Sequence, residues 1–315
     1  MARKALGPAS LQVVQAVTAA TGGPLLVACS GGPDSLALAA GAAVVARRRG
    51  DGVRAVVVDH GLQPGSETVA SAVAALLGSR VGIEAHVVRV DVTDDGSGPE
   101  AAAREARYAA LEQAAGANEL VLLGHTLDDQ AETVLLGLAR GSGLRSLSGM
   151  AMVRGRFVRP LLGLRRGVTL ACCAELGLEP WLDPHNADDR FARVRVRRRV
   201  LPMLEAELGP GVAEALARTA ELARADADLL DELAAEHAEA GAEGLSCRRL
   251  ADLDAALRSR VLRAWLLGEG AREVTASGVA AVSELVTDWH GQRWIDLPGL
   301  RVRRTGDHLQ GAVRS

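Results

Sequence analysis

The chain has 315 residues, of which 48% are hydrophobic, and a formal net charge of −3. A chain of this length most often contains two domains, and the larger one can bury a full core. No apolar run approaches the length of a membrane span, and residues 1–7 are charged but no signal-peptide hydrophobic region follows them. These features exclude an integral membrane protein and favour a protein of the cytoplasm.

The pattern of cysteines also favours the cytoplasm. Cys29, Cys172, Cys173 and Cys247 form no CxxC pair and show no spacing typical of disulfides. We therefore interpret each of them as a small buried hydrophobic residue in a reducing environment.

Charge is distributed unevenly along the chain. Residues 140–205 contain 13 arginines against 6 acidic residues, whereas residues 206–260 contain 6 arginines against 12 acidic residues. The basic block suggests a surface for a polyanion, and the acidic block suggests a solvated helical region.

Apolar runs and helical spacing alternate through the first part of the chain. Residues 10–21 are typical of a short amphipathic helix. Buried strands are predicted at 24–30, 54–60, 85–90 and 120–124, and helices at 36–47, 65–81, 99–115 and 127–139. Strands that alternate with helices at this spacing predict an α/β fold, a parallel sheet with helices on both faces. Ligands of such sheets bind beyond the carboxyl ends of the strands, where Ser30, Asp59 and His125 all lie.

A different pattern begins near Pro202. Residues 203–240 are rich in Ala, Leu and Glu and predict long helices, and helical spacing continues over 246–289. Residues 294–302 are typical of a closing hairpin. We predict a domain boundary at about residue 205, with the α/β domain over 1–205 and a smaller, mainly helical domain over 206–315.

The most informative stretch joins the first strand to the next helix and reads Ser30-Gly31-Gly32-Pro33-Asp34-Ser35. Glycines allow a sharp turn close to a ligand, and Pro33 suits the first turn of a helix. The free N–H groups at a helix N-terminus attract anions, above all phosphate. The segment Ser30 to Ser35 is not a Walker A loop, because no lysine follows the glycines. An aspartate is repelled by phosphate unless a cation lies between them, so Asp34 implies Mg²⁺. The alternative is an ordinary strand-to-helix turn capped by Gly32.

A second polar segment, Gly124 to Thr133, follows the fourth predicted strand. His125 and Asp129 are four residues apart and share a face if the helix begins near residue 125. The alternative is structural, because Thr126 and Asp129 have the spacing of a capping box and acids in a first turn favour the helix dipole. A zinc site is excluded, because there is no HExxH motif and no third ligand at a suitable spacing.

Arginines form the remaining candidates. Arg104 and Arg107 lie on one predicted helix and can face one cleft, although such a pair is also typical of a solvated stripe. Arg140 precedes two glycines that we interpret as a helix C-cap. Residues 190–199, the basic segment, contain six arginines in ten residues. That density suits phosphate contacts and, with single aromatics nearby, base stacking; the alternative is a solvated helix start.

Together these motifs resemble the tRNA(Ile)-lysidine synthetase family, which belongs to the PP-loop ATP pyrophosphatases. The similarity is carried by SGGPDS (30–35), VDHGL (58–62), R-x-x-R-Y (104–108), GHTLDDQAET (124–133), RGSG (140–143), RPLL (159–162), WLDPHN (181–186) and the arginine-rich run to Pro202. RVLRAWL (260–266) and LPGL (297–300) resemble the family's smaller substrate domain, and the chain resembles a short form. Val194 stands where the family usually has Asn, and His185 where it has a small hydroxyl residue.

The resemblance implies that ATP adenylates the C2 carbonyl oxygen of the wobble cytidine in a CAU-anticodon isoleucine tRNA. The ε-amine of free lysine then displaces AMP. It implies ATP and Mg²⁺ as cofactors, with Asp34 as the residue that holds the metal. Asp129 is the candidate base for the amine, His125 orients phosphate or base, and Arg104 balances charge. The remaining candidates are Ser30, Gly31, Gly32, Pro33, Asp34, Ser35, Asp59 and His60 for ATP, and Arg107, Asp128, Glu132, Arg140, Arg193, Arg195 and Arg197 for tRNA or substrate.

Three rival functions follow from the same loop. A tRNA thiolase of this type would need persulfide or cluster cysteines, typically CxxC pairs, but Cys172 and Cys173 are adjacent. An amidotransferase-type synthetase would need a glutaminase domain, for which the chain has no spare length. A non-catalytic nucleotide sensor would need neither the basic segment nor a second domain. The resemblance implies no membrane and no obligatory protein partner, and it leaves a homodimer open.

Overall fold

The computed structural model describes residues 6–61, 65–91, 99–141, 143–181, 188–238, 241, 243–291 and 294–314. The chain divides into two compact units. Unit 1 comprises Met1–Arg140 and Gly149–Ala220, and unit 2 comprises Gly141–Ser148 and Glu221–Ser315. The boundary expected from sequence at about residue 205 falls within α9 (Leu201–Leu208), which unit 1 contains.

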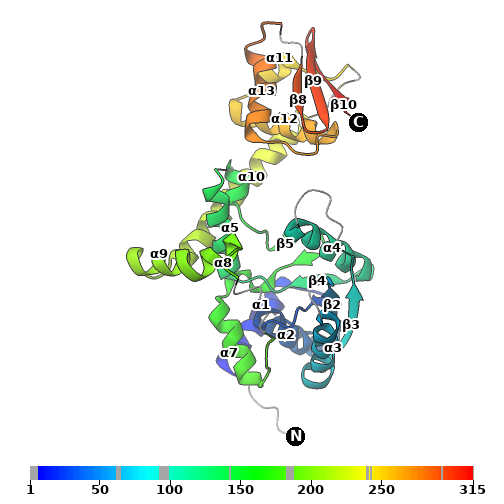
Figure 1. Ribbon diagram of the computed structural model, residues 1–315, viewed down its shortest axis with the longest axis vertical. Helices are drawn as coiled ribbons and strands as arrows, with labels where there is room; N and C mark the ends of the chain where they lie inside the picture. The colour runs from blue at the N-terminus through cyan, green and yellow to red at the C-terminus, as the bar shows by residue number, and fades with distance from the viewer. Residues whose placement is uncertain are drawn as a thin grey trace. The chain divides into compact units, whose positions relative to one another are not determined.

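Unit 1 is built on a six-stranded sheet in the order β3-β2-β1-β4-β6-β5 (Figure 1). The strands are β1 (Leu25–Ala28), β2 (Val53–Asp59), β3 (Glu84–Arg89), β4 (Leu120–Leu123), β5 (Val153–Arg154) and β6 (Phe157–Val158). Neighbouring strands from β3 to β6 are parallel, and β5 alone runs antiparallel, at the edge. The predicted parallel sheet is confirmed, whereas β5 and β6 were not predicted because each has only two residues.

Helices cover both faces of this sheet, which is why β1 and β4 consist of apolar residues. On one face, Leu25 and Val27 pack with residues of α1 (Pro8–Ala20), α2 (Pro33–Arg49) and α7 (Arg166–Leu176). On the other face, Leu26 and Val121 pack against α4 (Pro99–Ala114). The other helical segments of the unit are α3 (Ser66–Leu76), η1 (Leu77–Val81), α5 (Leu127–Ala139), η2 (Pro160–Gly163), α8 (Ala192–Arg195), η4 (Val196–Val200) and α9.

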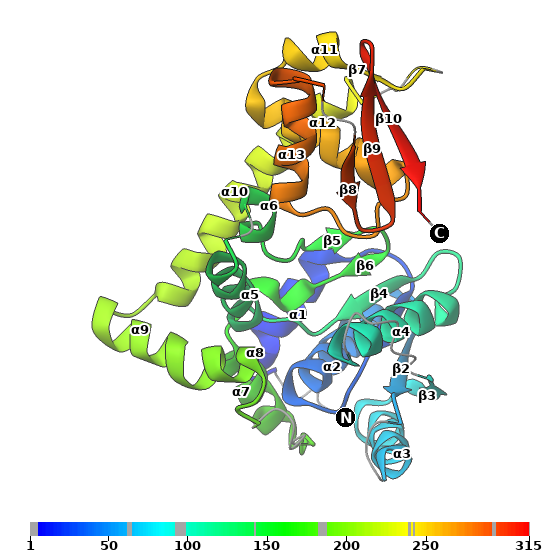
Figure 2. The ribbon, with the colours of Figure 1, turned by 45° about the horizontal axis from the view of Figure 1, so that its top comes forward.

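Unit 2 contains a four-stranded antiparallel sheet in the order β7-β10-β9-β8 (Figure 2). Its elements are α6 (Gly143–Leu147), β7 (Leu245–Ser246), α11 (Cys247–Ala251), α12 (Ala255–Gly268), α13 (Ala276–Thr287), β8 (Ile295–Leu297), β9 (Leu300–Thr305) and β10 (His308–Val313). The helix α10 (Val212–Ala235) ends within this unit. The predicted hairpin over 294–302 is present as β8 and β9, and β10 and β7 extend it into a sheet that packs on the helices.

Among the described helices, none has both the length and the apolar composition that a membrane crossing requires.

Candidate active site

The loop Ser30 to Ser35 connects β1 to α2 and is shaped by its own polar groups. The backbone N–H of Ser30 donates to Ser35 Oγ at 3.2 Å, and that hydroxyl donates to the Gly32 carbonyl at 3.0 Å. Gly31 has a φ of +83°, and a Cβ there would come within 2.4 Å of a methyl group of Val73. Conformation and space therefore both require glycine at this position. Gly32, as N-cap, has no side chain to bond the first N–H groups of α2, which leaves these donors for an anion.

The ends of β2, β1 and β4 lie side by side, as the sequence predicts for a parallel sheet. Gly124 brings the end of β4 against the loop, since a Cβ there would lie 3.1 Å from backbone atoms of Asp34 and Ser35. Asp59 ends β2 and is buried. It accepts a hydrogen bond from the N–H of Gly61 at 3.0 Å, which lowers its pKa together with a bond from Ser66. The carboxylate of Asp59 thus orders the turn after β2.

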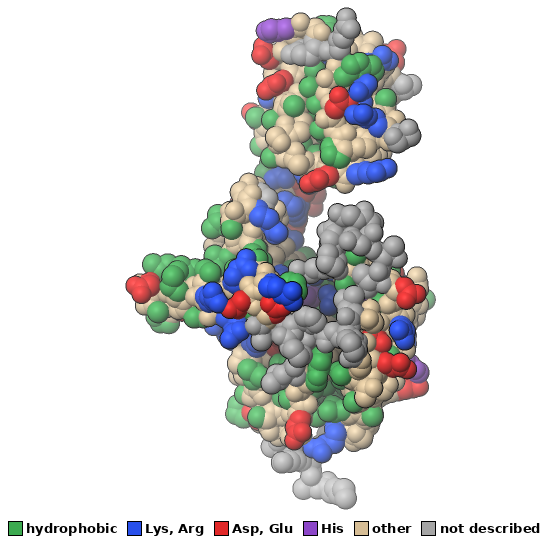
Figure 3. Space-filling view, in the orientation of Figure 1, with side chains coloured by type: hydrophobic (Ala, Val, Ile, Leu, Met, Phe, Trp, Pro, Cys, Tyr) green, Lys and Arg blue, Asp and Glu red, His purple; other side chains and the backbone are tan. Residues whose placement is uncertain are grey.

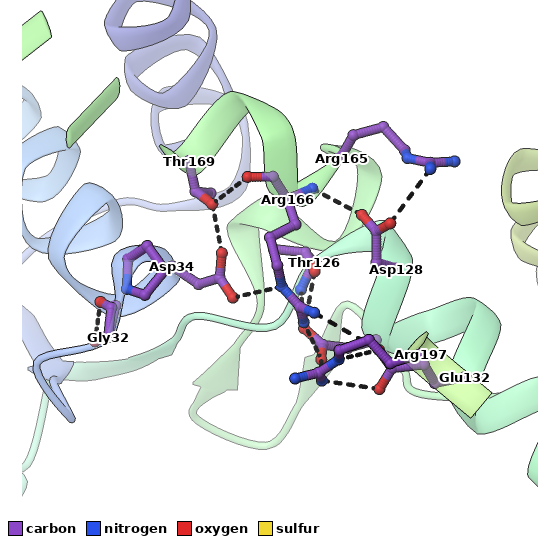
Figure 4. Close-up of polar contacts among 12 residues, drawn as sticks. Gly32, Asp34, Thr126, Asp128, Glu132, Arg165, Arg166, Thr169 and Arg197 are labelled. Atoms are coloured by element: carbon purple, nitrogen blue, oxygen red, sulfur yellow. Dashed lines mark hydrogen bonds and ion pairs between the residues drawn. The ribbon is translucent and has the colours of Figure 1, made fainter. Parts of the chain in front are cut away.

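Three carboxylates, Asp34, Asp129 and Glu132, form what we term the carboxylate cluster around the guanidinium of Arg166. Figure 4 shows Asp34 and Glu132 with Arg166. Arg166 donates from Nε to Asp34 at 3.2 Å and from a terminal nitrogen to Asp129 at 2.7 Å, and lies 3.7 Å from Glu132. Burial alone would lower the pKa of Arg166, but the surrounding carboxylates raise it. Arg166 therefore remains a cation that neutralises much of the cluster.

Asp34 accepts a second hydrogen bond, from the hydroxyl of Thr169 on α7. Burial raises the pKa of Asp34, and the opposing effects of Arg166 and Thr169 offset this only in part. The structure thus holds a carboxylate at the phosphate-binding loop under conditions that disfavour its charge. Such unfavourable burial of an acid is common at functional sites.

Asp129 has two sets of partners. One oxygen accepts from the backbone N–H and the hydroxyl of Thr126, both at 2.8 Å, and completes the predicted capping box of α5. The other oxygen accepts from Arg166 and, at 3.1 Å, from Arg197. Burial acts to raise the pKa of Asp129, but Arg166 and Thr126 outweigh it and lower the pKa. The capping interpretation is correct as geometry, yet it uses only one of the two oxygens.

Glu132 lies one turn further along α5 and is fully buried. Arg197 forms a bidentate pair with it, at 2.6 Å and 2.9 Å. Burial nevertheless raises the pKa of Glu132. The two acids of α5 therefore differ: Asp129 is the more firmly ionised, and Glu132 is the stronger base.

The N-terminus of α7 lies against the cluster, a position that no local sequence pattern predicts. Its first backbone N–H, on Arg166, donates to Asp128 at 2.7 Å, and Arg165 lies 3.4 Å from the same carboxylate. The Cys173 thiol donates to the Pro33 carbonyl at 3.4 Å. The sequence signal for these residues is the adjacent pair Arg165-Arg166, separated from RPLL by two residues, which contributes to the positive charge of residues 140–205.

A set of buried nitrogen atoms lies beside the cluster, which we term the cationic cradle: His60 Nδ1, Arg107 Nε, His125 Nδ1 and Arg159 Nε. None of these atoms has a hydrogen-bond partner in the described part of the chain. Arg107 lowers the pKa of both histidines, and Arg159 lowers that of His125, so the groups act on one another electrostatically. Unpartnered buried donors that gather in this way suit an anionic ligand.

Tyr108 links Arg159 of the cradle to the neighbouring Arg104. Its hydroxyl accepts from Arg159 at 3.0 Å and from Arg104 at 3.3 Å, and its ring packs on Phe157 with centroids 5.0 Å apart. Arg104 is exposed, whereas Arg159 is buried and was not identified from the sequence, although it begins the RPLL motif.

Comparison with known proteins agrees with this geometry. Residues 8–204 match the family model of the PP-loop domain, and residues 245–310 match that of the TilS substrate binding domain. A tRNA(Ile)-lysidine synthase of Leifsonia xyli subsp. xyli is 52% identical, over 90% of this chain and 88% of the relative. That of Mycolicibacterium paratuberculosis is 56% identical, over 89% and 88%. The chain belongs to the tRNA(Ile)-lysidine synthase family.

A solved structure shares the fold of this family member. The U34-tRNA thiolase NcsA from Methanococcus maripaludis, with its [4Fe-4S] cluster, aligns with a TM-score of 0.56 and 19% identity, over 69% of this chain and 78% of that one. The four cysteines of the present chain are buried, and no group of three or more His, Cys, Asp or Glu side chains suited to a metal occurs among the described residues.

The basic segment of this lysidine synthase family member is helical from Ala192 onward, as α8 and η4. Arg195 donates to the carbonyls of Asp189 and Arg190, both at 2.8 Å. Arg193 donates to the Thr133 hydroxyl at 2.8 Å, and Arg197 bonds the carboxylate cluster. Val194 is buried, so its departure from the family pattern lies in the interior. A tRNA role for Arg193, Arg195 and Arg197 stays a prediction, because these side chains also have partners within unit 1.

The remaining residues predicted from sequence lie at the end of α5 or outside the described residues. Arg140 is the exposed C-cap of α5. His185 and most of WLDPHN, Leu62 of VDHGL and Ser142 of RGSG lie outside the described residues.

His125 gives a first testable prediction, on pH-dependent stability. Burial, with the nearby arginines, lowers its pKa from 6.5 to about 3. The unfolded state therefore binds a proton that the folded state does not, and stability is lost as the pH falls from about 6.5. At pH 5 this effect amounts to about 2 kcal/mol.

We expect His125→Asn to remove that loss of stability when thermal melting is followed from pH 7.5 to 5. His86→Asn, which replaces an exposed histidine, should keep it. Equal pH slopes for wild type and His125→Asn would show that His125 is protonated in the folded state.

Proposed function

We propose that this chain ligates lysine to C2 of the wobble cytidine in the CAU-anticodon tRNA(Ile), with ATP converted to AMP and pyrophosphate. The observation that carries this proposal is the combination within one chain of an anion-binding loop, a carboxylate cluster and a region matching the TilS substrate binding domain. ATP use and a tRNA(Ile) substrate agree with the PP-loop match and with the names of the relatives. Free lysine as the second substrate is part of the proposal.

The reaction needs two displacements. The O2 atom of cytidine attacks the α-phosphorus of ATP, the bond from that phosphorus to the bridging oxygen breaks, and pyrophosphate leaves. The lysine ε-nitrogen then attacks C2, the C2–O2 bond breaks, and AMP leaves with that oxygen. The amine must give up a proton before or during this attack, so a base is required.

The loop and the cationic cradle have the chemistry to bind the phosphates. The N–H groups at the start of α2 and the unpartnered donors of Arg107 and Arg159 are suited to negative oxygens. His125 is neutral at physiological pH because of its low pKa, so it acts as a hydrogen-bonding group and not as a cation. We assign it to orienting a phosphate or the cytosine, with Arg104 balancing charge at the exposed side.

The residues present fit Mg²⁺. Asp34 already stabilises one cation, because the guanidinium of Arg166 lies between it and Asp129. Mg²⁺ would take the place of this guanidinium beside Asp34. Mg²⁺ is usually bound by one or two carboxylates together with substrate phosphates. Asp34 would hold it, and the bound ion would neutralise charge that develops on the phosphates.

The carboxylates of α5 suit the amine. Asp129, with its lowered pKa, stays ionised and can hold an ammonium group. Glu132, with its raised pKa, is the better proton acceptor of the two, although Arg197 must then release part of its bidentate contact. Asp129 remains our candidate for the group that contacts the amine, and the pKa directions add Glu132 to the proton path.

The decisive measurement is mass analysis of the anticodon nucleosides after incubation with ATP, lysine and the tRNA. We expect cytidine to gain the mass of lysine less one water. Pyrophosphate should form once ATP and the tRNA are present, whereas AMP release and continued turnover should also require lysine. Release of ADP and phosphate would contradict the loop assignment. A thiolated nucleoside, or nucleotide binding without turnover, would contradict the ligase function.

A further inference from the structure

Unit 2 contains a groove of about 400 Å³, within the range of ~300–1,000 Å³ that is typical of ligand sites. Two glycines make room for it. A Cβ on Gly311 would lie 3.0 Å from a carboxylate oxygen of Glu269, and one on Gly244 would lie 2.1 Å from the Leu309 carbonyl oxygen. The side chains that matter for its chemistry are Glu243, Trp265, Glu269, Trp294, Arg303 and Gln310.

An aromatic ring and a cation lie together in this groove. Trp294 is 39% exposed, and the guanidinium of Arg303 lies 5.2 Å from its ring centroid. Arg301 lies at a similar distance from the ring but is paired with Asp296 at 2.6 Å. Arg303 bonds the amide oxygen of Gln310 at 3.2 Å and has no carboxylate partner in the described part of the chain. Figure 3 shows basic side chains beside hydrophobic ones on the visible face of this unit.

The lining of the groove also contains two glutamates, Glu243 and Glu269, and the indole N–H of Trp265. The carboxylate of Glu269 lies beside Gly311, and that of Glu243 lies 3.5 Å from His308. The indole N–H of Trp265 is buried and, within the described residues, lacks a hydrogen-bond partner. An unsatisfied donor in a groove wall is one that a bound acceptor can satisfy.

We propose that this groove binds one unpaired nucleotide of the tRNA substrate, with its base stacked on Trp294. Aromatic rings with neighbouring arginines bind unpaired bases and their phosphates. The carboxylates favour a base with an exocyclic amino group, because that group carries two N–H donors, whereas uracil offers only its N3–H between two carbonyl oxygens. This inference rests on the proposed function, which supplies the tRNA.

The first test measures tRNA affinity across a salt series with the full chain. Trp294→Ala should weaken binding on the order of tenfold, the scale of one stacked base. Arg303→Ala should lower the log–log salt slope by about one unit. Trp289→Ala is the matched control, because Trp289 is also exposed and has Arg304 over its ring at 4.8 Å, but it does not line the groove. Wild-type affinity in folded Trp294→Ala would overturn the proposal, as would an equal loss in Trp289→Ala.

The second test uses short RNA and tryptophan fluorescence. With Trp181 and Trp289 replaced by Phe, the remaining indoles are Trp265, which is buried, and Trp294. Oligocytidylate should quench the fluorescence more strongly than oligouridylate of the same length. Absent quenching contradicts a nucleotide site, and equal quenching contradicts the preference for an amino-bearing base. Self-association that Trp294→Ala abolishes, with tRNA affinity unchanged, would instead assign the groove to a contact between copies.

Lysidine formation by the wild type is measured separately. If the groove does not bind a nucleotide, the proposed ligase function is unaffected, whereas absence of lysidine contradicts that function.

Discussion

Replacement of Asp34 by asparagine is expected to reduce adenylation by about 10²–10³-fold, the scale for loss of one electrostatic stabiliser in an active site. The folded protein should remain at least as stable as the wild type. Burial raises the pKa of Asp34, so its stabilising contribution is present in the protonated form and lost as the pH rises through its folded-state pKa. Asparagine resembles the protonated acid and keeps an oxygen that can accept from Thr169. Arg166 keeps Asp129 as a partner.

A purely structural Asp34 predicts the opposite pattern. An acid in the first turn of a helix stabilises it by roughly 0.3–1 kcal/mol through the helix dipole, so its loss should lower the melting temperature and leave turnover intact. Glu67→Gln is the matched control, because Glu67 occupies the first turn of α3, after the neighbouring strand, and is exposed. Melting curves and pyrophosphate release should be measured on both variants. Near-normal release from folded Asp34→Asn would remove the metal-binding role.

The parts of the site predicted from sequence are those that local rules determine. A buried apolar run followed by Ser30-Gly31-Gly32-Pro33 specifies a strand, a tight turn and a helix start within one short window. Strand ends of a parallel sheet share an edge, so the sequence predicts that Ser30, Asp59 and His125 lie together, and the strands that they follow are neighbours in the sheet.

The parts that were missed depend on contacts distant in sequence. Arg166 meets Asp34 from 132 positions away, and no periodicity of α7 indicates that pairing. The sequence predicts Arg197 as a tRNA contact together with Arg193 and Arg195. In the helical segment α8–η4, Arg193 and Arg197 are four residues apart and both lie against the buried Glu132, whereas Arg195 bonds backbone carbonyls. A buried glutamate needs a paired cation, which a count of arginines cannot assign to one side chain.

Replacement of Asp129 by asparagine tests whether this residue takes part in catalysis or only caps α5. From sequence, asparagine at this position is expected to preserve most of the capping. Both carboxylate oxygens are acceptors, one for Thr126 and one for the arginines, and an amide offers only one. Asp129→Asn should therefore also lose stability, by about 1–3 kcal/mol for the donors left without an acceptor. A stability change in this variant alone cannot identify the cap.

Thr126→Ala separates the two roles. It removes the hydroxyl that donates to Asp129, which should cost about 1 kcal/mol, while the carboxylate and its contacts with Arg166 and Arg197 remain. We expect this variant to melt earlier but to form lysidine within a few-fold of the wild-type rate. Asp129→Asn should lose about 10²-fold or more in the lysine-dependent step, measured from preformed adenylated tRNA so that ATP chemistry does not contribute. If the two variants lose activity in proportion to their loss of stability, Asp129 acts only as a cap. Glu132 is then the residue expected to contact the lysine amine.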